Sequence, residues 1–199
     1  MTRARMLSVV MTLLVAGAGG AASAWSADGK TVLRLRATAV DLGGITAQGT
    51  RPAGATVLEI GIERFTSDAE HAKLAAVLAE KGSDALMSAL QKLPPAGYIR
   101  TPGSLRWNVH YAREIPLSEG GRRIVIATDR PMNFYELWNR PRSADYQYLL
   151  AEIRLGSDGK GRGTLVPAAR IEYNAPTKTI EVENYASQPV RLTEVRVEK

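Results

Sequence analysis

The chain has no cysteine and only two histidines, His71 and His110. The absence of cysteine excludes disulfides, thiolate metal ligands and the lipid-modified cysteine of a bacterial lipoprotein. Two histidines cannot build a three-histidine zinc site. We therefore expect no metal and no cofactor, and a domain that is held together by its hydrophobic core alone.

Common catalytic motifs are also missing. There is no G-x-S-x-G elbow for a serine nucleophile. The glycine-rich segment 156–163 lacks the lysine and serine or threonine that end a phosphate-binding loop, so we interpret it as a flexible hairpin connection. Glu181 and Glu183 share a strand face with Glu172 opposite, which indicates a solvated outer face more than a catalytic carboxylate pair.

The N-terminus has the pattern of a secretory signal peptide. Arg3 and Arg5 precede an apolar run, 6–18, and the small residues Ala22 and Ala24 flank Ser23. We predict a signal peptide over residues 1–24, cleavage after Ala24 and a location in the bacterial periplasm or outside the cell. A retained anchor is the alternative, but the run is shorter than the roughly 20 apolar residues that a spanning helix needs.

Composition and charge indicate one soluble globular domain over residues 25–199. The chain is 45% hydrophobic and 23% charged. Its 26 basic and 20 acidic residues give a net charge of +6, and removal of Arg3 and Arg5 leaves 24 against 20, or +4. The arginines are scattered from Arg34 to Arg196, whereas nucleic-acid sites cluster their basic residues. We expect no nucleic-acid partner.

The hydrophobic pattern predicts an α+β protein that is mostly β, with an antiparallel sheet or partly closed barrel of about eight or nine strands. Short connections late in the chain favour antiparallel pairing. Pro167 indicates an edge position or a bulge. The predicted strands are 30–38, 55–62, 105–112, 122–128, 146–155, 164–173, 179–184 and 189–197.

One helical insertion is expected over about residues 67–93. Ser67 and Glu70 have the spacing of a capping box, Gly82 ends the first helical stretch, and Pro94 ends the second. The result is a helical hairpin or a kinked helix. Residues 41–52, which are rich in glycine, read as a loop.

Aromatic residues and arginines concentrate in residues 98–148, around a long connection after strand 122–128. Such residues are enriched in recognition surfaces. The candidate ligand- or partner-binding residues are Trp107, Phe134, Tyr135, Trp138, Arg140, Arg142 and Tyr146. The alternative is that Phe134 and Trp138 pack as a lid on the core. Asp129 and Arg130 are expected to pair with each other or with Arg64 and Glu63.

Three segments resemble a group of uncharacterised secreted bacterial proteins. They are Arg64-Phe-Thr-Ser-Asp-Ala-Glu70, Ala127-Thr-Asp-Arg-Pro131, and Ile180-Glu-Val-Glu-Asn-Tyr185 with Pro189-Val-Arg-Leu192. The resemblance runs over most of the mature chain. It implies an exported bacterial protein, and it transfers no activity and no functional residue.

Two functions follow as hypotheses. The first is a non-enzymatic periplasmic or secreted binding module for a small apolar or anionic ligand or a partner protein. The second is a hydrolase of envelope material that uses carboxylates such as Asp129, Glu136 and Glu152.

Overall fold

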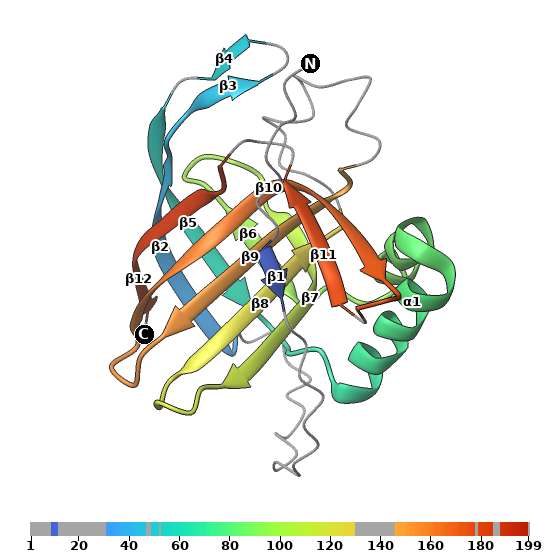
Figure 1. Cartoon of the computed structure of the whole chain (residues 1–199). Helices are drawn as coiled ribbons and strands as arrows, with labels where there is room; N and C mark the ends of the chain where they lie inside the picture. The colour runs from blue at the N-terminus through green and yellow to red at the C-terminus, as the bar shows by residue number, and fades with distance from the viewer. Residues whose placement is uncertain are drawn as a thin grey trace.

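The computed structural model describes residues 9–11, 31–46, 49–51, 53–129, 146–177, 179–184 and 188–198 (Figure 1). Most of these residues lie in antiparallel strands, and one helix lies against the outside of the sheet, as the sequence predicts. The strands are β1 (Val9–Met11), β2 (Leu33–Asp41), β3 (Gly44–Thr46), β4 (Gly49–Arg51), β5 (Gly54–Ile62), β6 (Gly97–Arg100), β7 (Trp107–Pro116), β8 (Arg122–Thr128), β9 (Tyr148–Leu155), β10 (Lys160–Asn174), β11 (Thr179–Asn184) and β12 (Val190–Glu198).

Eight of these strands close into a barrel. Their order is β10-β12-β2-β5-β6-β7-β8-β9, and β9 pairs with β10 again to complete the ring. Along each strand, side chains alternate between the interior and the outer face. The interior is filled by apolar side chains from every strand, among them Leu35, Ile60, Ile126 and Ile153, which are fully buried.

The long strand β10 changes partners along its length. Residues 160–165 pair with β12, whereas residues 169–174 pair with β11. Pro167 lies between these two parts, at a shift in the register with β9. A proline cannot donate a backbone hydrogen bond, so it suits this interruption, and the bulge that Pro167 predicts is confirmed. On its other side β11 pairs with β1.

The glycine-rich segment is mostly strand. Only residues 156–159 form the turn between β9 and β10, so the interpretation of 156–163 as a flexible connection is wrong for residues 160–163. Gly161 and Gly163 face Leu155 and Ile153 of β9. A Cβ atom on Gly161 would overlap the carbonyl oxygen of Arg154, so the close approach of β10 to β9 requires glycine there.

The helix α1 (Asp68–Gln91) follows the predicted pattern. Ser67 and Glu70 form the capping box, and Gly82 breaks the helix with a φ of 78°. Of the two predicted alternatives, a helical hairpin and a kinked helix, the structure has the kinked helix. Buried residues of α1, including Leu78 and Leu90, belong to a second apolar cluster with Tyr148 and Ile171 on the outside of the barrel.

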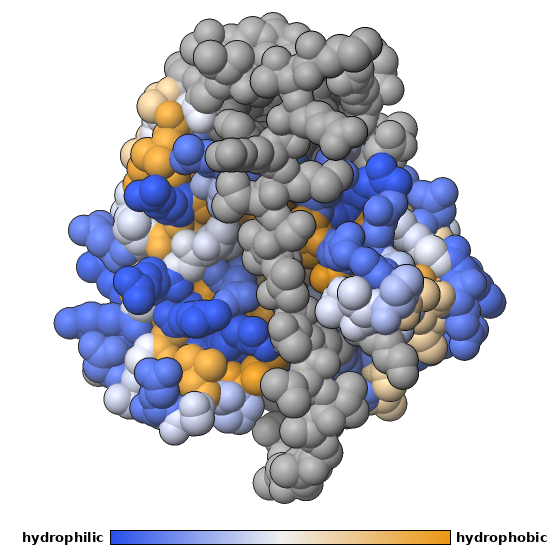
Figure 2. Space-filling view, in the orientation of Figure 1, coloured by the Kyte–Doolittle hydropathy of each residue, from blue (hydrophilic) through white to orange (hydrophobic). Residues whose placement is uncertain are grey.

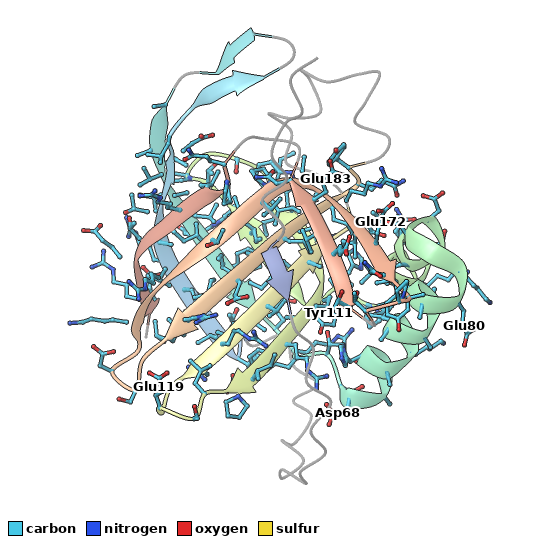
Figure 3. All side chains as sticks on the ribbon, viewed as in Figure 1. Asp68, Glu80, Tyr111, Glu119, Glu172 and Glu183 are labelled. Atoms are coloured by element: carbon cyan, nitrogen blue, oxygen red, sulfur yellow. The ribbon has the colours of Figure 1, made fainter. Side chains whose placement is uncertain are left out.

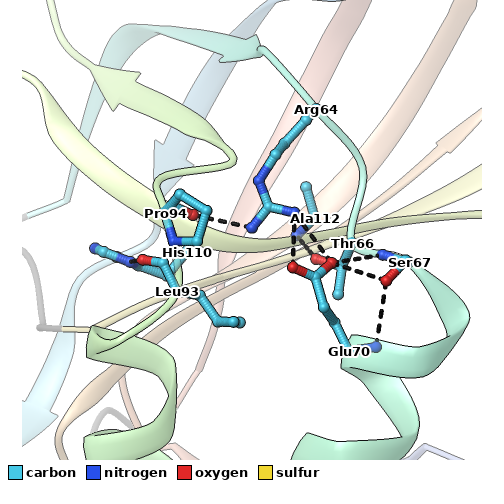
Figure 4. Close-up of polar contacts among 8 residues, drawn as sticks. All are labelled: Arg64, Thr66, Ser67, Glu70, Leu93, Pro94, His110 and Ala112. Carbon is cyan, nitrogen blue, oxygen red and sulfur yellow. Dashed lines mark hydrogen bonds and ion pairs between the residues drawn. The ribbon is translucent and has the colours of Figure 1, made fainter. Parts of the chain in front are cut away.

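Arg64 ties the two ends of α1 together (Figure 4). Its guanidinium donates to both carboxylate oxygens of Glu70, at 3.0 and 3.1 Å, and to the carbonyl oxygen of Pro94, at 3.0 Å. Asp129 is not among these partners, so of the two expected pairings the one with Arg64 is not formed, and the pairing of Asp129 with Arg130 lies outside the described residues. Both bonds to Glu70 come from Nη1, and charge-assisted hydrogen bonds of this kind hold the guanidinium beside the capping residue.

Three local features differ from the sequence prediction. Strand β6 was not expected, and β3 and β4 form a short hairpin within the predicted loop 41–52. A register shift between Val109 and Tyr111 interrupts the alternation of faces expected along a regular strand, so Val109 faces the interior while Tyr111 packs against the helix cluster. No helix among the described residues is long and apolar enough to cross a membrane.

Replacing Gly161 with alanine tests the close approach of β10 to β9. Because the new methyl group would meet backbone and not a flexible side chain, we expect Gly161→Ala to lower the free energy of unfolding by more than about 2 kcal/mol. Gly54→Ala is the control, since a Cβ there meets nothing within 4 Å. Urea unfolding of both variants measures the difference, and equal stabilities would contradict the role of Gly161.

Candidate functional site

Of the sequence-predicted binding residues, the structure describes Trp107 and Tyr146. Trp107 pairs with the interior-facing Ile99, so it points into one end of the barrel, where it is 7% exposed. Its indole N–H has no hydrogen-bond partner. Tyr146 is half-buried just before β9. Phe134, Tyr135, Trp138, Arg140 and Arg142 lie outside the described residues, so the expected grouping stays a prediction.

The bulge on β7 buries His110. Its Nδ1 lies 3.0 Å from the carbonyl oxygen of Leu93, just after α1 (Figure 4). Its Nε2 lies 3.7 Å from Asp129. Asp129 thus lies beside a histidine. Glu152 lies opposite Val125, four residues before Asp129, which separates these two carboxylates by roughly 13 Å along the sheet. This spacing does not favour joint catalysis by Asp129 and Glu152; Glu136 lies outside the described residues.

The outer face of the barrel carries a row of cations that the sequence analysis missed. Arg123 of β8 lies directly opposite Arg154 of β9, and Arg154 lies directly opposite Arg162 of β10. Two residues along β10, on the same face, Lys160 lies opposite Arg196 of β12, which lies opposite Arg36 of β2. Arg113 of β7 neighbours Arg123 diagonally. We call these seven residues the cationic belt: Arg113, Arg123, Arg154, Arg162, Lys160, Arg196 and Arg36.

Acidic partners compensate only part of the belt. Arg113 pairs with Asp68 at 2.9 Å, Arg154 with Glu152 at 2.9 Å, and Arg36 with Glu198 at 3.7 Å. Arg123, Arg162, Lys160 and Arg196 form no ion pair with any part of the chain that the structure describes. Figure 2 shows hydrophilic residues gathered over the side of the molecule formed by β12 and β10.

The register explains why scattered arginines form one surface. Side chains alternate between the two faces along each strand, and Arg154, for example, lies between the interior-facing Ile153 and Leu155, so it points outward. Barrel closure then aligns residues that lie up to 160 positions apart, from Arg36 to Arg196. One pattern in the sequence could have predicted this surface: basic residues alternate with apolar residues or glycine, as at Arg34 and Arg36 or at Lys160 and Arg162.

A polar cluster lies where the belt meets the start of α1. The hydroxyl of Tyr111 lies 3.1 Å from Nδ1 of His71, and Figure 3 shows Tyr111 between the barrel and the helix. Burial raises the pKa of Tyr111 to about 12. Burial, together with the charge of Arg113, lowers the pKa of His71, although Asp68 partly opposes this shift. Both effects favour the neutral form of His71.

Unused hydrogen-bond donors remain in the same place. Nη1 of Arg113 and Nε of Arg123 are buried and have no hydrogen-bond partner. Arg113 uses its other terminal nitrogen, Nη2, for Asp68. A buried donor without a partner loses its hydration without compensation, so each such atom calls for an explanation.

Carboxylates gather at the other part of β10. Glu172 lies directly opposite Glu181, and both are exposed, as is Glu183 (Figure 3). Glu172 pairs with Arg170, and Glu181 accepts a hydrogen bond from Asn174 at 2.6 Å. This arrangement agrees with the solvated outer face that the sequence indicates. Within the described ranges, no three histidine, aspartate or glutamate side chains are grouped so as to hold a metal ion.

The lowered pKa of His71 predicts a pH dependence of stability. The unfolded chain takes up this proton near pH 6.5 and the folded chain resists it, so the contribution of His71 is complete above pH 6.5 and is lost as the pH falls. We expect the free energy of unfolding to decrease from pH 7 to pH 5.5, and to decrease less in His71→Gln. Urea unfolding across this range would contradict the assignment if both proteins gave the same slope.

The belt also predicts an unusual gain of stability. Like charges directly opposite each other destabilise a sheet, so Arg162→Thr should raise the free energy of unfolding by about 0.2 to 1 kcal/mol at low salt. Arg191→Thr is the matched control, because Arg191 lies opposite Thr164 and Val40. A stability loss in Arg162→Thr that exceeds the loss in the control would show that Arg162 is a structural residue.

Comparison with known proteins adds no assignment to this geometry. No protein-family model matches the chain, and no curated protein or solved structure matches it either. The candidate site is therefore defined by its own residues, which are the cationic belt and the donors at its β7 end.

Proposed function

We propose that the protein is an exported, non-enzymatic binding module and that its cationic belt binds a linear polyanion, such as an acidic polysaccharide. The observation that supports this proposal is the direct opposition of like charges in four cross-strand pairs: Arg123 with Arg154, Arg154 with Arg162, Lys160 with Arg196, and Arg196 with Arg36. Each such pair destabilises the sheet. A bound anion would relieve the repulsion between these like charges and would accept charge-assisted hydrogen bonds from the arginines, which are strong.

The shape of the belt favours a flexible chain over a flat membrane. The belt crosses six consecutive strands, from β7 to β2, which is five of the eight steps around the barrel. Neighbouring strands lie about 4.8 Å apart, so the belt runs for roughly 24 Å over a convex surface. A planar lipid surface would touch only part of it, whereas a polymer with repeated acidic groups can follow all of it.

The chemistry of the belt favours an acidic polymer without bases. Proteins that bind single-stranded nucleic acids stack the bases on aromatic side chains between their basic residues. The belt consists of arginines and one lysine, and Tyr111, the aromatic residue beside it, is held at its hydroxyl by His71. The proposal therefore keeps the expectation that nucleic acid is not the partner.

The position of the barrel agrees with export. The belt begins at Arg36 in β2, well after the predicted cleavage at Ala24, so processing would remove β1 and leave every belt strand in place. The proposed location is the periplasm or the outside of the cell. The apolar interior is packed with side chains such as Leu58 and Ile124, which supports an anionic over an apolar ligand.

The experiment measures binding of fluorescein-labelled polygalacturonate to the chain that begins at Trp25. We expect Arg154→Gln combined with Arg162→Gln to weaken binding at least about tenfold at 50 mM salt, and to lower the salt dependence by the release of about two counterions. Lys73→Gln with Lys81→Gln removes the same charge from the exposed face of α1, and should change affinity less than twofold.

Two further probes complete the test. Phosphatidylglycerol vesicles and a single-stranded DNA oligonucleotide should bind more weakly than polygalacturonate at equal charge concentration. Equal losses in the belt variant and the helix control would overturn the proposal, because the polymer would then respond to net charge alone. Preferential capture of vesicles or DNA would also overturn it.

A further inference from the structure

We propose that Arg113 and Arg123 form a phosphate-binding clamp at the β7 end of the cationic belt, so that the acidic group of the polymer is a phosphate. This inference rests on the proposed function, because it names the group that the belt binds. The observation that carries it is the pair of buried, unpartnered donors, Nη1 of Arg113 and Nε of Arg123.

The register places these two arginines side by side. Arg113 lies opposite Val125 and Arg123 lies opposite Ile115, so the two arginines are diagonal neighbours on the outer face, with Cα atoms roughly 7 to 8 Å apart. Both charges act on Tyr111, where each favours the ionised form of the hydroxyl. One tetrahedral oxyanion can accept from both guanidinium groups at once.

The described residues around the two donors supply little negative charge. Asp68, the acidic partner of Arg113, contacts Nη2, and its side chain is 94% exposed, so the buried Nη1 stays unused. Arg123 has no acidic partner within the described chain. His71 and Tyr111 complete each other's hydrogen bond nearby and add no negative charge while the hydroxyl stays protonated.

Phosphate fits these donors better than a carboxylate. The two donors belong to different arginines on neighbouring strands, and a planar carboxylate already occupies the exposed side of Arg113. A phosphate group offers three or more oxygens in different directions and a higher charge, and paired guanidinium groups are well suited to it. Lysine in either position would keep the charge but remove the planar fork.

The first measurement follows the arginine Nε–H signals of the chain from Trp25 by NMR during titration with inorganic phosphate, and with acetate as the carboxylate probe. We expect the Arg123 signal to shift with phosphate and to shift far less with acetate. The Arg154 signal serves as the internal control, because Arg154 Nε already donates to Glu152 at 2.9 Å. Equal shifts with both anions, or no shift of Arg123, would overturn the clamp.

The second measurement uses polyphosphate chains and polygalacturonate with charge-conserving variants. Arg113→Lys combined with Arg123→Lys should weaken polyphosphate binding at least about tenfold and weaken polygalacturonate binding by a clearly smaller factor. Arg154→Lys combined with Arg162→Lys is the matched control and should not alter the preference for polyphosphate. Far-ultraviolet circular dichroism confirms that each variant is folded.

The outcomes separate the clamp from the proposed function. If polygalacturonate and polyphosphate bind the wild type equally and the Arg113/Arg123 variant loses both, the clamp is wrong while the polyanion-binding belt stands. If neither polymer binds, the proposed function fails; an Arg123 shift specific to phosphate would then still support a phosphate site. Stronger binding to phosphatidic acid vesicles than to polyphosphate would overturn the assignment to a polymer.

Discussion

The close approach of β10 to β9 is the constraint on which the rest of the structure depends. Without it the sheet would stay open, and β8 and β9 would not be aligned with β12 and β2. Gly161 and Gly163 make the approach possible because they present no Cβ atom to the backbone of β9. Lys160, Arg162 and Thr164 alternate with these glycines and point outward. Residues 160–164 therefore both close the barrel and supply the centre of the cationic belt.

The division of β10 at Pro167 separates two surfaces of opposite charge. Before the proline, β10 lies between β9 and β12 and carries unpaired cations. After it, β10 pairs with β11 and carries Glu172 opposite Glu181, with α1 packed on the apolar side. A long strand that changes partners thus places basic and acidic groups in distinct regions, which supports one defined site for an anion over a uniformly charged surface.

The helix α1 is held against the barrel beside one end of the cationic belt. Arg64 holds both ends of α1 close to the barrel, and Tyr148 donates to the carbonyl oxygen of Ser83 at the Gly82 break, at 2.6 Å. These contacts position Asp68 and His71 beside Arg113 and Tyr111. The two unpartnered arginine donors lie in this corner, where partial burial makes a missing partner more costly than it would be on an open strand.

The sequence by itself determined the local elements. The capping box at Ser67, the break at Gly82, the bulge at Pro167 and most strands follow from side-chain periodicity and from the backbone preferences of serine, glycine and proline, which act over a few residues. Only the tertiary structure decided that the sheet closes, that β6 completes it, and that Tyr111 turns outward after a bulge. It also decided that Arg36, Arg196, Arg162, Arg154 and Arg123 form one surface, because strand register joins residues that are distant in the chain, and no local pattern encodes that register.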